Sequence, residues 1–139
     1  MFMAWKDHIR GLKTLISLGA NVNERTNSGE TALMWATTNS YISYNESYRT
    51  YIRKKANIVT TLIKAGADVN AIADNGYTAL MVAADKGEIQ IVKILLKASA
   101  DATLRNTYGQ TAITLAARNG HTRVVELLKN SAVSISRRQ

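Results

Sequence analysis

Residues 76–84, with the sequence GYTALMVAA, decide the fold because the same phrase occurs three times. It recurs 33 residues later as GQTAITLAA at residues 109–117, and an earlier copy, GETALMWAT, stands at residues 29–37. A fixed period of this length indicates stacked copies of one supersecondary unit. Arrays of this kind are usually binding scaffolds.

A second phrase alternates with the first. It reads LISLGANVN at residues 15–23, LIKAGADVN at 62–70 and, shortened, LLKASAD at 95–101. The glycines in the first two copies stand where a helix commonly ends in the left-handed conformation. Ser99 replaces the glycine in the third copy, so we expect mild backbone strain there.

Each unit should contain two helices. A threonine stands before each first helix, where its hydroxyl can accept a hydrogen bond from an orphan amide. The first helices are rich in alanine, and the second are so apolar that neighbouring units must cover them. Leu15, Leu62, Leu95 and Leu128 occupy one place in this apolar stripe. We expect helices near Thr31–Asn39, Thr78–Asp85, Ile89–Lys97, Thr111–Arg118 and Thr122–Lys129.

The chain resembles the ankyrin repeat family, whose 33-residue unit is a β-turn followed by two antiparallel helices. The family's Thr-Pro-Leu-His-x-Ala start corresponds here to TALMWA, TALMVA and TAITLA, and its Gly-Ala-Asp-Val-Asn exit to the second phrase. Two departures are the absence of proline and the presence of Met34, Met81 and Thr114 where the family usually has histidine. The resemblance implies an all-α solenoid of about four helix–turn–helix units. We expect this solenoid to be a single domain, 1–139, with units of about 1–25, 26–72, 73–105 and 106–139.

The two ends depart from the repeat. Aligning Leu15 with Leu95 places residues 3–9 over residues 83–89, the end of a first helix and its turn, so we expect the chain to begin inside a first helix. This start fits either a degenerate N-terminal cap or an internal start in a longer protein. Residues 130–139 lose the exit phrase and are expected to form a frayed polar cap. Lys6 and Asp7 follow the first residues at once, so no signal peptide is visible and a cytoplasmic location is favoured.

The second unit carries an insertion. Its first phrase, at residues 29–37, stands 47 residues before that of the third unit instead of 33, which places 14 extra residues near 41–54. Four tyrosines there, Tyr41, Tyr44, Tyr48 and Tyr51, are spaced to share one face of a helix. We therefore expect the second helix to start early, around Glu46–Tyr48, and to run through Lys64.

Two interpretations of the insertion stay open. The tyrosine stripe either packs against the array, leaving Arg49 and Arg53 toward solvent, or forms a projection that grips a partner or a second copy of the chain. This candidate secondary surface comprises Tyr44, Tyr48, Arg49, Tyr51 and Arg53.

The composition restricts the function classes. The net charge is +8, spread over all four units, which fits either a solvated surface or attraction to acidic proteins, anionic lipid or nucleic acid. The chain has no cysteine, and no apolar run approaches the length of about 18 residues that a membrane helix needs. Of its two histidines, His8 has no spaced metal-binding partner, and His121 follows Gly120 where the family often has a structural histidine. We therefore expect no catalytic, cofactor or metal site.

The resemblance implies a binding surface made of turn tips and the exposed face of the first helices. Carried over by position, its residues are Trp5, Arg25, Asp74, Asn75, Tyr77, Lys86, Arg105, Tyr108 and Arg118. Exposed aromatics beside arginine are typical of interface anchors. The favoured function is a non-enzymatic, monomeric scaffold that binds an unidentified protein partner. The alternatives are a basic binder of nucleic acid or anionic surfaces, which is less favoured, and a self-associating structural module.

Overall fold

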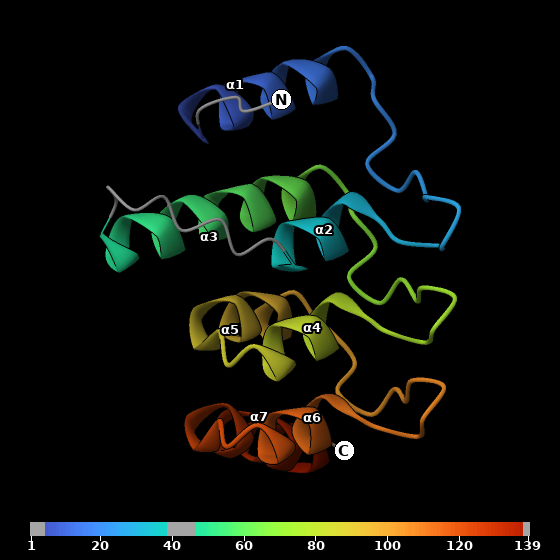
Figure 1. Cartoon of the computed structure of the whole chain (residues 1–139), viewed down its shortest axis with the longest axis vertical. Helices are drawn as coiled ribbons and strands as arrows, with labels where there is room; N and C mark the ends of the chain where they lie inside the picture. The colour runs from blue at the N-terminus through green and yellow to red at the C-terminus, as the bar shows by residue number, and fades with distance from the viewer. Residues whose placement is uncertain (1–4, 39–46, 138–139) are drawn as a thin grey trace.

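The chain folds into a stack of helical pairs with turns extending from one side (Figure 1). The computed structural model describes residues 5–38 and 47–137, and the side chains of residues 5–8 and of Ile135 lie outside this description. The helices are α1 (Trp5–Ser17), α2 (Ala32–Thr38), α3 (Tyr48–Lys64), α4 (Ala79–Asp85), α5 (Ile89–Lys97), α6 (Ala112–Arg118) and α7 (Thr122–Arg137). Within the described ranges, the only β-pairing is an isolated bridge between Arg25 and Thr31.

The helices form two layers. The short first helices α2, α4 and α6 pack on one another in order, and the second helices α1, α3, α5 and α7 form the other layer (Figure 1). This arrangement is that of a helical repeat solenoid, and it confirms the predicted all-α fold. Because each unit packs only on its neighbours, the core is continuous along the stack.

Threonine caps start the first helices as predicted. The Thr78 hydroxyl accepts from Met81 N at 3.3 Å, and the Thr111 hydroxyl accepts from Thr114 N at 3.4 Å. Thr114 returns a bond, since its hydroxyl accepts from Thr111 N at 2.8 Å and completes a capping box. Thr114, which replaces the family's histidine, therefore satisfies a second orphan amide.

The core consists of the apolar second helices and the small residues of the first. Ile91, Val92 and Leu95 of α5 are fully buried, and so are Ala83 and Ala84 of α4. The alanines allow α4 and α6 to approach closely, which a larger side chain would prevent. A second helix is covered on both sides only when its unit has one neighbouring unit before it and another after it.

The insertion forms part of α3, which starts at Tyr48 and runs through Lys64 as predicted. The Ser47 hydroxyl caps it by accepting from Thr50 N at 3.4 Å. The predicted inward tyrosine stripe is wrong for Tyr48, whose side chain is 64% exposed, whereas Tyr51 is buried. Tyr41 and Tyr44 lie outside the described residues.

The predicted first-helix start of the chain is wrong. Residues from Trp5 onward belong to α1, which continues without a break through Ser17. The equivalent turn in the third unit depends on Gly87, whose φ is +70°. Asp7 stands at that position here, so the left-handed turn is disfavoured and the helix continues.

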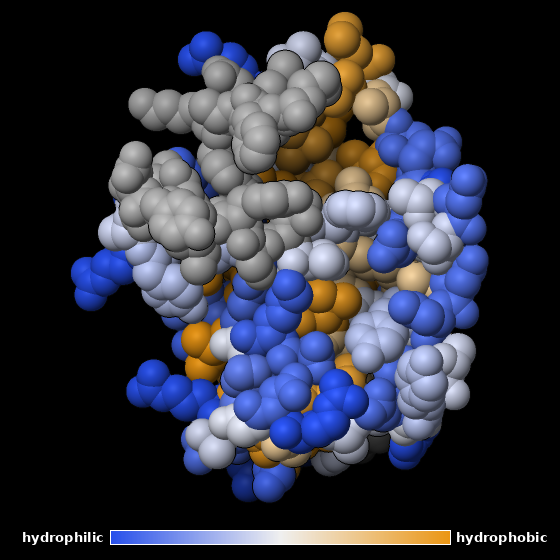
Figure 2. All heavy atoms as spheres, in the orientation of Figure 1, coloured by the Kyte–Doolittle hydropathy of each residue, from blue (hydrophilic) through white to orange (hydrophobic). Residues whose placement is uncertain are grey.

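The expected burial of Leu15 is also wrong, because its side chain is 58% exposed. The described residues of the first unit contribute one helix, α1, and no first helix covers its apolar side. Leu18 and Trp35 are exposed at the same end of the stack. Figure 2 shows apolar surface gathered at this N-terminal end.

The C-terminal cap differs from the prediction as well. Helix α7 does not end at Lys129 but runs on to Arg137. The added residues contain neither glycine nor proline. The Ser134 and Ser136 hydroxyls donate to the carbonyls of Asn130 and Ala132, so these polar residues are accommodated within the helix.

Ser99 adopts the left-handed conformation that the missing glycine predicts. Its φ is +68°, and it is the one non-glycine residue with positive φ in the described ranges. Such a conformation costs about 1–2 kcal/mol for a residue with a Cβ atom. The surrounding unit therefore holds Ser99 in a strained backbone state.

Candidate partner-binding surface

The turn tips are joined directly to one another. Asp74 N donates to the Ser28 carbonyl at 3.0 Å, and Thr107 N donates to the Asn75 carbonyl at 3.1 Å. Gly76 allows the second of these contacts, since a Cβ atom there would lie 2.7 Å from Thr107 N. The tips therefore form a continuous, ordered edge along one side of the stack (Figure 1).

Asparagines of the exit phrase add a second set of links between units. Asn23 Oδ1 accepts from Asp68 N, and Asn70 Oδ1 accepts from Asp101 N, each at 2.7 Å. Asp101 in turn accepts from the Thr103 hydroxyl and amide, which lowers the pKa of Asp101 below its ordinary value. The backbone below the tips is thereby held from unit to unit.

The fourth tip presents an aromatic side chain beside an arginine. Tyr108 is 78% exposed, and Arg105 Nη1 donates to the carbonyl of Gly109 in the same tip at 2.7 Å. Tyr108 N donates to Asn106 Oδ1 at 3.0 Å, so the backbone that carries the ring is fixed. This pair has the composition of an interface anchor.

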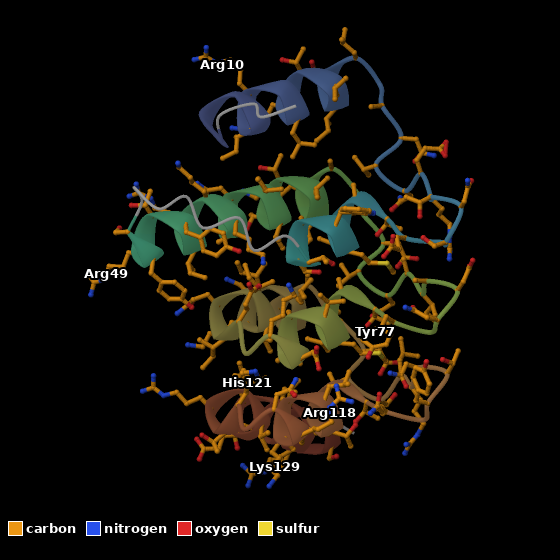
Figure 3. The ribbon with its side chains drawn as sticks, viewed as in Figure 1. Arg10, Arg49, Tyr77, Arg118, His121 and Lys129 are labelled. Carbon is orange, nitrogen blue, oxygen red and sulfur yellow. The ribbon has the colours of Figure 1, made fainter. Side chains whose placement is uncertain are left out.

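The third tip is less open than predicted. Tyr77 is half-buried and packs against the hydrophobic core, so the expectation that it has no core role is wrong. Figure 3 shows Tyr77 on the same side of the stack as the turns. Asn75 accepts from Tyr77 N at 3.1 Å through its side chain, and both Asp74 and Asn75 are exposed.

Several predicted contact residues bond to a neighbouring unit. The Arg118 guanidinium forms an ion pair with Asp85 at 3.1 Å (Arg118 is labelled in Figure 3). Lys86 Nζ donates to the Thr38 carbonyl, and the Arg25 guanidinium donates to the Ile72 carbonyl. These side chains are exposed, yet they also couple successive units, so their substitution would affect both stability and any contact.

His121 has the structural role that its position predicts. Its Nε2 lies 3.0 Å from the carbonyl oxygen of Asp85 in the preceding unit. The ring also fills the space beside Gly87, where a Cβ atom would lie 2.4 Å from Nδ1. His121 therefore links two units. No group of three or more metal-ligating side chains occurs in the described parts of the chain.

One exposed aromatic residue was missed by the sequence reasoning. Trp35 on α2 is 47% exposed, whereas Leu115, at the same position of the fourth unit, is buried. The described residues of the first unit form only α1, so within that part of the chain no first helix packs against this face of α2. The predicted Trp5 lies on α1 and not on a first helix, and its side chain lies outside the description.

The secondary surface divides into two parts. Tyr48, Arg49 and Arg53 line a groove of about 410 Å³ between α3 and the start of α5. Tyr51 instead turns inward, with its ring centroid 5.7 Å from Lys55 Nζ. Tyr44 lies outside the described residues, and of the other four predicted residues three are brought together at the groove.

Comparison with known families identifies the class of protein. The family described as ankyrin repeats (3 copies) matches residues 50–139, and the chain therefore belongs to the ankyrin repeat family. Ankyrin repeats generally mediate protein–protein interaction and are generally non-catalytic. A search of curated proteins gave no match. No helix in the described ranges is long and apolar enough to cross a membrane.

Proposed function

We propose that this chain is a non-catalytic scaffold that binds a protein partner through its turn tips and the exposed face of its first helices. The observation that carries the proposal is the exposure of Tyr108 beside Arg105, on a tip that is bonded to the tip before it. The proposed scaffold is a monomer and one domain, 1–139, with units of about 1–25, 26–72, 73–105 and 106–139.

The mechanism is rigid presentation. Binding costs free energy when side chains and loops become ordered at the interface. Here the Thr107–Asn75 and Asp74–Ser28 backbone bonds order the tips before any partner arrives. A partner therefore meets a surface whose shape is already established, and its contacts with Tyr108 are offset by little loss of backbone entropy.

The basic side chains of this surface favour an acidic partner face. Arg25, Lys86, Arg105 and Arg118 are all exposed. Each donates to an oxygen within the protein, which holds the charged group in place. A guanidinium retains further N–H donors after making one bond, so the three arginines can also donate hydrogen bonds to a carboxylate of a partner.

The experiment is a pull-down with the full chain, with the captured proteins identified by mass spectrometry and their affinity then measured with purified components. Tyr108→Ala and Arg105→Ala should each weaken the interaction by about tenfold or more, as expected for an anchor. Circular dichroism should show an unchanged fold. Val133→Ala, at an exposed apolar residue of α7 outside the tips and the first helices, is the control and should bind normally. Equal binding by the wild type and both tip variants would place the interface elsewhere, and light scattering tests the monomeric state.

A further inference from the structure

The insertion creates a groove on the side of the stack away from the tips. Its residues lengthen α3, so the first turns of this helix extend beyond α5 (Figure 1). Between the two helices lies a groove of about 410 Å³. Its apolar lining comes from Ile52, Ala56, Ile89 and Ile94.

Two arginines and a tyrosine stand at the same groove. Arg49 and Arg53 are four residues apart on α3, so their side chains lie on one face of the helix. Both are exposed, and Figure 3 shows Arg49 projecting away from the stack. Tyr48 is 64% exposed and lines the groove beside them.

A buried carboxylate oxygen in the groove lining has no hydrogen-bond partner. Glu88 is one of the lining residues, and only 9% of its side chain is exposed. Its Oε1 bonds to Lys55 Nζ at 2.6 Å, whereas Oε2 has no hydrogen-bond partner within the described structure. Leaving a buried acceptor unpaired costs about 1–3 kcal/mol, and more for a charged group. The oxygen is itself buried, so the Glu88 side chain must turn toward the groove before a donor entering the groove removes this cost.

These features specify the chemistry of an occupant. An apolar floor accepts an aliphatic side chain, and a pair of guanidinium groups binds carboxylates through charge-assisted hydrogen bonds. The unpaired oxygen of Glu88 requires an N–H or O–H donor. A segment of polypeptide supplies all three, because its backbone carries N–H donors between the side chains.

We propose that the groove between α3 and α5 binds an acidic segment of a partner protein. An aliphatic side chain of the segment lies on Ile52 and Ile89, flanking carboxylates pair with Arg49 and Arg53, and one donor bonds to Glu88 Oε2. This site lies on the opposite side of the stack from the tips, and it stands whether or not the tips bind a partner.

The test uses random dodecapeptides displayed on phage and selected on the immobilised full chain. Selected peptides should be enriched in Asp or Glu on either side of Leu, Ile or Val. Synthetic copies should lose at least tenfold in affinity for Arg49→Glu and for Arg53→Glu. Gln90→Trp, which fills the groove from an exposed lining position, should weaken them similarly.

Arg123→Glu, at an exposed arginine of α7 outside the groove lining, is the matched charge control and should change the affinity less than twofold. Arg105→Glu tests whether the peptides bind the fourth tip instead. Circular dichroism and thermal melts establish that each variant is folded. The proposal is overturned if selection yields no acidic enrichment, or if affinity falls with Arg105→Glu and not with Arg49→Glu. It is also overturned if single-stranded dT20 or anionic vesicles bind at Arg49 and Arg53 while the peptides do not.

Discussion

Lys55 Nζ lies 2.6 Å from Glu88 Oε1, and the two side chains form a buried ion pair between the second and third units. Lys55 is fully buried, and it also donates to the Thr37 carbonyl at 2.9 Å. The two residues are 33 positions apart, so they occupy equivalent places in their units, and His121 occupies the next. A position where the family often has histidine thus connects successive units here by different chemistry.

Removing one partner of this pair should destabilise the fold strongly. Lys55→Met leaves the Glu88 carboxylate buried without its cation, and the loss of one partner of a buried pair typically costs about 3–5 kcal/mol. The double variant Lys55→Met/Glu88→Gln should recover part of this loss, because no buried charge remains. Urea melts of the wild type, both single variants and the double variant measure the coupling. Additive losses would show that the pair is not a coupled unit.

The leucines of the apolar stripe are buried to different extents, and the loss of stability on truncation should be larger for the more buried ones. Leu95 is fully buried, so Leu95→Ala should cost about 2–5 kcal/mol through lost transfer energy and a cavity. Leu15 occupies the same repeat position but is 58% exposed, so Leu15→Ala should cost less than about 1 kcal/mol. Denaturant melts compare the two. A loss below about 0.5 kcal/mol for Leu95→Ala would mean that the repeat register is wrong.

Relieving the strain at Ser99 should stabilise the protein. Its φ of +68° suits glycine, and Ser99→Gly should raise the free energy of unfolding by up to about 1 kcal/mol after the greater chain entropy of glycine is subtracted. The reverse change at the equivalent Gly66, whose φ is +91°, should lower it by a similar amount. Thermal melts measure both. A destabilised Ser99→Gly variant would contradict the strain argument.

The insertion should behave as an ordered helix in solution. Amides from Tyr48 to Ile58 lie within α3, and Tyr51 and Lys55 anchor this part to the core. Hydrogen exchange should therefore show protection there comparable to that of residues 91–96 of α5. Rapid exchange from Tyr48 to Lys55 would mean that this segment becomes ordered only when a partner binds.

Local chemistry was sufficient to predict the repeat and most helix limits. Helix α5 begins and ends as predicted, at Ile89 and Lys97, because an apolar run is bounded by turn residues on both sides. The early start of α3 and the strained Ser99 also followed from spacing and from a missing glycine. These features depend on residues close together in the chain, so the sequence carries them directly.

The site was less accessible to the same reasoning. Tyr77 follows its tip glycine and Tyr108 precedes its own, and only the structure shows that Tyr77 packs on the core whereas Tyr108 is exposed. The groove needs α3 and α5 side by side, and its residues come from two different units. The position of a residue within its repeat does not show which residues of the neighbouring unit a long side chain will contact.

The repeating unit, its caps and its family could be read from short phrases that recur along the chain. The burial of Lys55 against Glu88, the exposure of Leu15 and Trp35, and the position of Tyr48 at a groove became visible only in the folded stack. This is because the burial of a side chain depends on how its unit packs against the neighbouring unit. Equivalent residues have different environments wherever one unit is longer than its neighbour or lacks a helix beside it.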